Sequence, residues 1–252
     1  MRIENSFVPV DGIGETIERR LWRRGVTHWD DFSTDVLGGK RGRGIDEFLT
    51  TARDRLDRGD TEYFASALPD GEEWRLYENV RDEACFFDIE TTGLSPGRDR
   101  VTVVGIHQGG DTETYVRESD LDRSVVERIA DAPLLVTFNG ASFDVPFLES
   151  AFDVDIDAPH LDLRYACRRV DLTGGLKTVE REVGIGRDRP DLSGRDAVRL
   201  WHEYERGDES ALDTLVSYNR DDAANLERLA DHVTGCLHDA VFESVRAEIA
   251  DD

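Results

Sequence analysis

The chain has 252 residues, 38% of them hydrophobic, which is enough for one α/β core and a small additional domain. Its 55 acidic and 31 basic residues give a net charge of -24, and Lys40 and Lys177 are the only lysines. This excess of acids predicts a protein adapted to concentrated salt, where the repulsion between its own charges is screened.

No long apolar stretch or signal-peptide pattern is present, so we exclude a membrane protein and expect a cytoplasmic one. Cys85, Cys167 and Cys236 lie far apart, which excludes a disulfide framework or a zinc ribbon and predicts reduced, mostly buried thiols.

The first 80 residues have the pattern of a small helical domain. Apolar residues at helical spacing predict a helix over 13–24. Regular Phe, Leu and Tyr positions predict further helices over 44–60 and 61–80. We therefore predict a helical domain over residues 1–81.

The start of this domain resembles one half of a helix-hairpin-helix, a motif in which backbone N–H groups of a Gly-x-Gly turn contact a DNA phosphate. The turn is formed here by Gly12, Ile13 and Gly14, and Glu15 departs from the motif because an acid repels a phosphate. The helix after the turn carries four arginines: Arg19, Arg20, Arg23 and Arg24. The sequence is compatible with two roles for Gly12 and Gly14, contact with a phosphate and simple helix packing. A second basic cluster, residues 38–44, predicts a flexible loop that reaches substrate.

The pattern changes near residue 84, where short β-rich runs separated by turn residues begin. The runs that predict strands are 83–90, 100–108, 113–118 and 133–138. An amphipathic pattern predicts a helix over 119–132, and from about residue 143 the pattern is mostly helical. This order predicts an α/β domain over 82–252 with a mixed sheet flanked by helices.

Several acidic side chains lie in apolar settings rather than on the acidic surface. Asp88 and Glu90 are two residues apart at the end of a predicted buried strand, so both point to the same face of the sheet. Asp144 lies between Phe143 and Val145, after a turn that contains glycine. Because an unpaired carboxylate is costly to bury there, we expect a positive charge nearby, and the neighbouring sequence supplies none.

Two further candidate site residues, a tyrosine and an acid, lie close together in the last part of the sequence. Tyr218 and Asp222 are four residues apart in a predicted helix and therefore share one of its faces. The adjacent Asp221 takes the place of Asp222 if the helix is rotated. A packed core tyrosine is the alternative for Tyr218.

These residues lie in three motifs that resemble those of the ribonuclease H-like DEDD superfamily of exonucleases. The motifs are "DIETTGL" (88–94), "NGASFDVPFL" (139–148) and "YNRDD" (218–222). The tyrosine resembles the DEDDy branch, and "GLKTVEREVGI" and "AVRLWHEYERGD" resemble the YprB-type proteins within it. The resemblance spans residues 84–232 and implies a ribonuclease H-like mixed sheet of five strands.

The resemblance implies a 3′–5′ exonuclease that acts on single-stranded ends of DNA or RNA with two Mg²⁺ or Mn²⁺ ions. The carboxylates that the family pattern assigns to the metal ions are Asp88, Glu90, Asp144 and Asp222. Asp88 would bridge both ions, and Tyr218 would orient the attacking water. Oxygen ligands suit these hard ions, and two such ions activate water and neutralise the leaving oxygen.

Other residues match positions that contact the 3′-terminal nucleotide in relatives. These are Thr91, Asn139 and Leu94, the last as an apolar wedge, and turn geometry explains them nearly as well. We expect Asp162 to cap a helix rather than to bind metal. In concentrated salt, counterion release contributes little, so an enzyme of this kind must hold its substrate by metals, backbone hydrogen bonds and stacking.

Two alternatives are kept open. One is a non-catalytic nucleic-acid-binding adaptor of the same fold, and the other is a structure-specific endonuclease. The sequence does not distinguish DNA from RNA as the substrate. It also does not identify a helicase or repair partner or the oligomeric state.

Overall fold

The computed structural model describes residues 1–250, which form two compact units. One unit combines residues 1–81 with the chain from Thr234 on, and the other is Asp82–Val233. The domain boundaries 1–81 and 82–252 stay a prediction, and the compact units differ from them at the C-terminal end. The reason is visible in the packing, since the Trp22 and Phe242 rings meet edge to face with centroids 5.0 Å apart.

The second unit is built on a mixed five-stranded sheet. Its strands are β1 (Cys85–Thr91), β2 (Val101–Gln108), β3 (Asp111–Val116), β4 (Leu135–Thr137) and β5 (His160–Asp162). The order is β3-β2-β1-β4-β5, in which β1, β4 and β5 are parallel while β2 is antiparallel to both of its neighbours. The predicted α/β class with a mixed sheet and flanking helices is confirmed.

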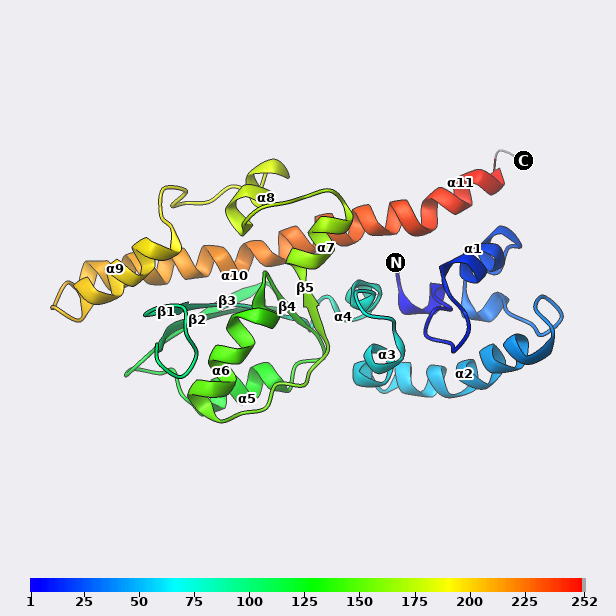
Figure 1. Cartoon of the computed structure of the whole chain (residues 1–252), viewed down its shortest axis with the longest axis horizontal. Coiled ribbons are helices and arrows are strands. Elements are labelled where there is room, and N and C mark those ends of the chain that lie inside the picture. The colour runs from blue at the N-terminus through cyan, green and yellow to red at the C-terminus, as the bar shows by residue number, and fades with distance from the viewer. Residues whose placement is uncertain (251–252) are drawn as a thin grey trace. The chain divides into compact units, whose positions relative to one another are not determined.

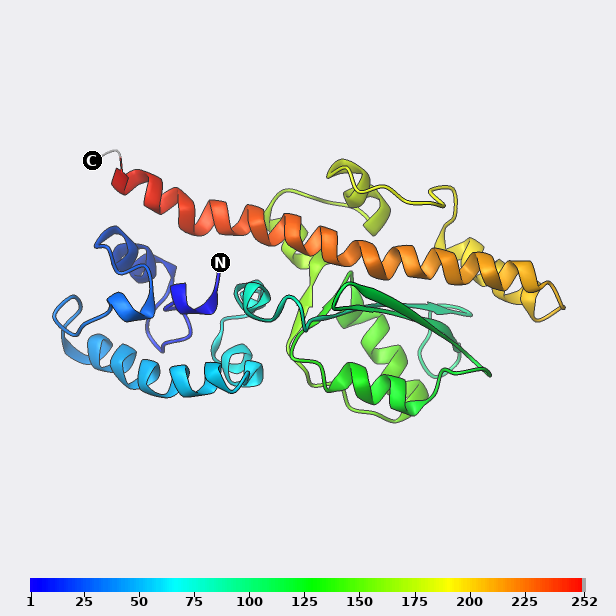
Figure 2. The same ribbon diagram turned by 180° about the vertical axis from the view of Figure 1, so that it is seen from behind.

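Helices cover both faces of this sheet. Figure 1 shows α5 (Arg123–Ala130) and α6 (Asp144–Phe152) on one side and α10 (Glu209–His238) on the other, and Figure 2 shows the same layers from behind. Because side chains alternate along a strand, Phe87 and Ile89 of β1 enter the core with α5 and α6. Asp88 and Glu90 therefore lie on the face that α10 covers.

A 3-10 turn at Gly140–Ser142 precedes α6, and the remaining α-helices of this unit lie in its C-terminal half. They are α7 (Leu163–Arg169), α8 (Leu176–Glu182) and α9 (Gly194–Tyr204). Trp201 of α9 packs with Leu215 and Tyr218 of α10 and with Val103 of β2 in a second apolar cluster. This cluster fixes α10 against the sheet next to the acids of β1.

A glycine in β2 lets α10 approach the sheet closely. A Cβ atom at Gly105 would lie 2.4 Å from Asn219 Oδ1 and 3.2 Å from Ala223 Cβ, both on α10. Gly105 is also the register partner of Asp88 in the β1–β2 pair. Helix, β2 and Asp88 are thus in contact at one point.

The first unit is helical. Its helices are α1 (Glu15–Arg23), α2 (Gly39–Asp57), α3 (Thr61–Ala67), α4 (Tyr77–Val80) and α11 (Ser244–Ala250), with short 3-10 turns at Ile3–Asn5, Trp29–Asp31 and Glu73–Leu76 and a π-helical turn at Asp239–Glu243. The expectation of a flexible loop over 38–44 is wrong, because α2 begins at Gly39.

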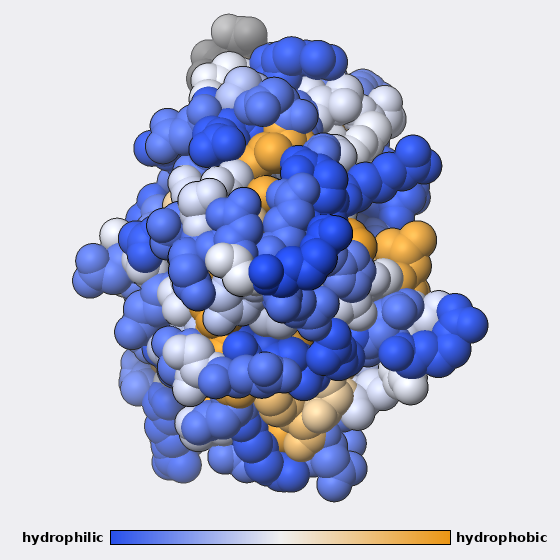
Figure 3. Space-filling model, turned by 90° about the vertical axis from the view of Figure 1, so that its left-hand side faces the viewer, coloured by the Kyte–Doolittle hydropathy of each residue, from blue (hydrophilic) through white to orange (hydrophobic). Residues whose placement is uncertain are grey.

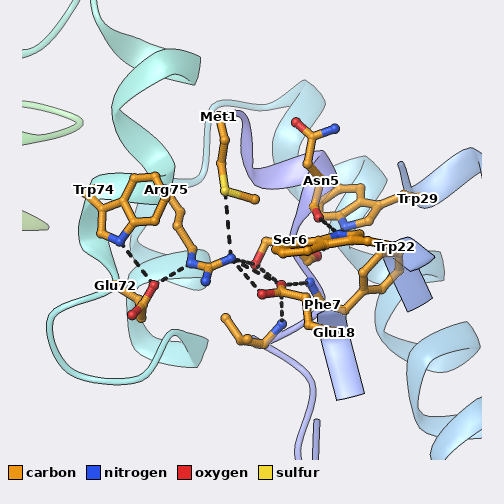
Figure 4. A network of polar contacts seen from close by, with 11 residues as sticks. Met1, Asn5, Ser6, Phe7, Glu18, Trp22, Trp29, Glu72, Trp74 and Arg75 are labelled. Atoms are coloured by element: carbon orange, nitrogen blue, oxygen red, sulfur yellow. Dashed lines mark hydrogen bonds and ion pairs between the residues drawn. The ribbon is translucent and has the colours of Figure 1, made fainter. Parts of the chain in front are cut away.

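A buried ion pair holds this unit together (Figure 4). Glu18 of α1 accepts hydrogen bonds from Ser6 Oγ at 2.9 Å and from the Phe7 backbone at 2.7 Å. Arg75 Nη1 donates to Glu18 Oε2 at 3.0 Å, and its Nε donates to Glu72. Both side chains of the Glu18–Arg75 pair have 0% exposure, so the charges are compensated by one another rather than by water.

Hydrophilic side chains cover most of the face drawn in Figure 3, and apolar side chains show only in small patches. Within residues 1–250, none of the helices combines the length and apolar character that crossing a bilayer requires. Cys85 and Cys167 are free, buried cysteines, as predicted, and Cys236 is partly buried.

Candidate metal centre

Three carboxylates converge where β1 meets α10. Asp88, Glu90 and Asp222 each offer one oxygen, and these oxygens all lie within 4.8 Å of one another. Glu90 and Asp222 are buried, and Asp88 is partly buried. The two-residue spacing on β1 points Asp88 and Glu90 to one face, and the register shift after Glu90 ends the regular pairing with β2 there.

Asp144 lies next to this cluster but is not one of its three members. It is the first residue of α6, is buried, and accepts a hydrogen bond at 3.2 Å from the backbone N–H of Ile89, the residue between Asp88 and Glu90. Of the four predicted metal ligands, the structure thus brings three into one group and places the fourth against the same strand.

The carboxylates raise one another's pKa values. Burial first, and then the neighbouring carboxylates, hold the pKa values of Asp88 and Glu90 well above their ordinary range. Burial also raises the pKa of Asp144 to about 7 and that of Asp222 to about 6, the latter in spite of an arginine beside it. Negative charge is therefore costly here unless a cation shares the site.

Two cations from the segment 177–187 reach this cluster. Arg187, whose side chain is only 5% exposed, forms ion pairs with Asp222 and with Glu180. Burial opposes the charge of Arg187, but the two carboxylates outweigh it and raise its pKa. Lys177 Nζ lies 4.7 Å from the centre of the Tyr218 ring and has no hydrogen-bond partner among the described residues.

The sequence does not identify either cation as part of the site. A positive charge is expected near the buried acids, but their neighbouring sequence supplies none. The signal available was that Lys177 is one of only two lysines in the chain and falls within the motif "GLKTVEREVGI". Arg187 lies two residues beyond that motif and carried no signal of its own.

Tyr218 is both a core residue and a residue of the site. It packs in the α9–α10 cluster with 6% exposure and also lines the cavity at the carboxylates. Burial, and then Asp222 and the acids of β1, raise the pKa of its phenol, so the hydroxyl stays neutral. Asp221, the alternative to Asp222, points elsewhere and accepts from the backbone of Asp188 at 3.0 Å.

Asn219 is a third residue of the site that the sequence does not indicate. It is fully buried on α10, and its Nδ2 donates to the backbone oxygen of Asp88 at 3.1 Å and to Asp88 Oδ2 at 3.2 Å. It therefore fixes both the strand and the carboxylate. Its place directly after Tyr218 is visible in the sequence, but its contact with β1 is not.

The predicted substrate contacts fall beside two different cavities. Thr91 and Leu94 line a cavity of about 590 Å³ together with the carboxylates, and Leu94 is 82% exposed. Asn139, with a left-handed backbone at φ 73°, lines a second cavity of about 580 Å³ and contacts Arg164. Asp162 caps α7 by accepting from the Arg164 backbone at 3.0 Å, which confirms the expected cap.

Gly12 and Gly14 belong to the other unit. Gly12 has φ 76°, and Gly14 is the N-cap of α1. Gly12 lines a cavity of about 850 Å³ with Lys40 and Arg41 of α2. Arg23, one of the four arginines predicted on the helix after this turn, is paired with Glu248 at 2.9 Å.

The carboxylate cluster fits a divalent cation. Its donors are carboxylate oxygens without His or Cys, the set that hard ions such as Mg²⁺ prefer. Their burial and mutual repulsion leave a concentration of negative charge, which Arg187 offsets in part through its ion pair with Asp222. The residues that could hold such an ion are Asp88, Glu90 and Asp222, with Asp144 adjoining.

Comparison with known proteins gives a family match over most of the second unit. A family model described as RNase_H superfamily matches residues 85–234. No curated protein matches the chain. Among solved structures, Brucella melitensis NrnC bound to pGG has 24% identity and a TM-score of 0.49, covering 69% of this chain and 83% of that chain. NrnC with bound Mg²⁺ has 22% identity and a TM-score of 0.48 over the same shares. The family B DNA polymerase of Pyrobaculum calidifontis has 21% identity and a TM-score of 0.46, covering 60% and 24%.

Proposed function

Because the chain belongs to the RNase H superfamily, whose model matches residues 85–234, we propose that it is a metal-dependent nuclease that hydrolyses phosphodiester bonds of DNA or RNA. The observation that carries this proposal is the group of three carboxylates within 4.8 Å on β1 and α10. A protein that only binds a polyanion gains nothing from concentrating negative charge at one point.

The finer proposal is a 3′–5′ exonuclease of the DEDDy branch, similar to the YprB-type proteins, that acts on single-stranded ends. What supports it is the order of the three motifs in the sequence and the position of Tyr218 beside Asp222 on α10. We further propose two Mg²⁺ or Mn²⁺ ions, held by Asp88, Glu90, Asp144 and Asp222. When bound, such ions supply an activated water and neutralise the charge of the leaving oxygen.

The protein's own residues would position the reactants. The phenol of Tyr218 is neutral, so we assign it the orientation of the attacking water through its hydroxyl rather than proton abstraction. Asn219 would hold the carboxylate of Asp88 in place through its 3.2 Å hydrogen bond. Arg187 and Lys177 would add positive charge beside the reacting phosphate.

The terminal nucleotide would lie in the 590 Å³ cavity. Leu94 is exposed enough to wedge against a base, and the Thr91 hydroxyl, which donates to the Gly93 carbonyl, lies at the end of β1. Asn139 would contact the strand from the second cavity. In the other unit, Gly12 and Gly14 would offer backbone N–H groups to a phosphate. The acidic composition supports a salt-adapted setting for this activity, and we propose the cytoplasm as its location.

Cleavage assays at high KCl test the proposal and its alternatives. The substrates are 5′-labelled single strands, the same strands with a blocked 3′ end, and single-stranded circles, each with Mg²⁺, Mn²⁺ or EDTA. We expect stepwise shortening of free 3′ ends, protection by the block, intact circles and no activity in EDTA or in Asp88→Asn. Cut circles would instead support the endonuclease. An absence of cleavage on every substrate with either metal would support the adaptor.

A further inference from the structure

The cavity beside Asn139, in the unit Asp82–Val233, is positively charged although the protein as a whole is strongly acidic. It has a volume of about 580 Å³ and is lined by Phe138, Asn139, Arg164, Arg168 and residues 173–176. Two of these side chains are guanidinium groups, and none is an acid, although the chain has 55 acids against 31 bases. A positively charged cavity on so acidic a protein is suited to an anion that competes with high salt.

An exposed aromatic ring lies beside this cavity. Tyr165 of α7 is 49% exposed, and Leu94 is the other large hydrophobic side chain that stands exposed in the described part of the chain. The guanidinium of Arg168, three residues along the same helix, lies 5.8 Å from the centre of the Tyr165 ring. Ring and guanidinium thus form one surface on α7.

The sheet topology relates this surface to the carboxylates. The strands β1, β4 and β5 are parallel neighbours, so their carboxyl ends share one edge of the sheet. The acids end β1, Asn139 follows β4, and α7 follows β5 directly. Two strand spacings separate β1 from β5, which amounts to roughly 10 Å. A single strand of nucleic acid whose 3′ end lies at the carboxylates can therefore continue over β4 toward α7.

We propose that α7 is a second binding site for a single nucleic-acid strand, in which Arg164 and Arg168 hold a backbone phosphate in the cavity and the Tyr165 ring stacks on a base. The inference rests on the proposed function, because it takes the carboxylates as the place of the strand's 3′ end. Guanidinium groups match phosphate with paired hydrogen bonds. Stacking survives salt that abolishes binding by charge alone, and a base paired in a duplex cannot offer its face to the ring.

Equilibrium binding tests this site separately from catalysis. Anisotropy is measured in EDTA at high KCl with two labelled probes, a single strand of about 12 nucleotides and a dinucleotide. Tyr165→Leu and Arg168→Gln are each expected to weaken binding of the long strand about 10-fold and to change binding of the dinucleotide less than about 2-fold. Both side chains are exposed, so neither change should affect folding.

Matched variants exclude a general charge or packing effect. Tyr165→Phe keeps the ring and should bind the long strand like wild type. Arg128→Gln removes the same charge from the exposed face of α5 and should also leave binding unchanged. Unchanged affinity of Tyr165→Leu and Arg168→Gln for the long strand would overturn the inference, as would an equal loss for the dinucleotide. If the two variants lose the long strand while wild type cleaves no substrate, the strand site stands and only the proposed nuclease function fails.

Discussion

Asp144 shows that the negative charge of the candidate site lowers the stability of the folded protein. Its pKa is raised to about 7 by burial, so its ionised form is less stable in the folded protein than in water. The Ile89 N–H that it accepts from would also satisfy an amide oxygen. An uncharged side chain with an amide oxygen at position 144 can therefore accept the same hydrogen bond.

Asp144→Asn should stabilise the metal-free protein by roughly 1–2 kcal/mol, because it removes a buried charge and keeps the hydrogen bond. It should also abolish cleavage. Urea unfolding in EDTA measures the first effect, and Asp157→Asn, an exposed acid, is the control for the change in net charge. Wild-type cleavage rates in Asp144→Asn would remove Asp144 from the proposed ligand set.

Arg187→Gln should have the opposite effect on stability. Loss of the guanidinium leaves Glu180 and Asp222 buried without their cation, at a cost of about 3 kcal/mol in EDTA. The loss should shrink when Mg²⁺ is added, because a bound cation takes over the charge compensation. Unfolding with and without Mg²⁺ gives both values, and Arg189→Gln, an exposed neighbour, should change neither. Equal stability of the variant and wild type in EDTA would contradict this view of Arg187.

The sequence predicts the acids of the site better than its cations. Asp88 and Glu90 can be predicted from their two-residue spacing on a strand, and Asp222 from its four-residue separation from Tyr218. Both are local sequence patterns. Arg187 meets Asp222 only after a loop has folded back onto α10. Such long-range contacts leave no periodic trace in the chain.

At the scale of elements, the close approach of α10 to β2 decides where the site forms. Gly105 leaves the room that Asn219 occupies, and Asn219 in turn holds Asp88. The prediction of strands from sequence succeeded for the long runs, such as the one at β2. It did not separate β5, because three residues between helical segments carry too little pattern.

Gly105→Ala should destabilise the protein by about 1–3 kcal/mol and weaken Mg²⁺ binding, because the added Cβ pushes α10 and Asp222 away from β1. Gly235→Ala is the matched control on α10 itself. Its Cβ meets nothing within 4 Å, so it should stabilise the helix by roughly 0.5–1 kcal/mol. Urea unfolding and calorimetric Mg²⁺ titration measure the two effects. A neutral Gly105→Ala would mean that the helix can move without cost.

At the scale of the whole chain, the charge of -24 governs the response to salt. Hydrophilic side chains cover most of the face in Figure 3. Because the chain has 55 acidic and 31 basic residues, its surface charges repel one another across water. Raising KCl from about 0.1 M to about 1 M shortens the Debye length from about 10 Å to about 3 Å. The urea midpoint should therefore rise steadily over this range. A flat or falling midpoint would contradict the prediction of salt adaptation.

The unit that contains Glu18 and Arg75 combines residues 1–81 with the segment from Thr234 on, and Trp22 packs against Phe242. During synthesis on the ribosome, residues 1–81 emerge before residues 82–233, but their unit is complete only after the segment from Thr234 on has followed. The continuous segment 82–233 has all of its own residues sooner. The order of completion should thus reverse the usual rule that the amino-terminal part folds first. Protease digestion of nascent chains stalled with residues 1–233 clear of the ribosome should show a protected RNase H-like unit, while residues 1–81 are still cleaved.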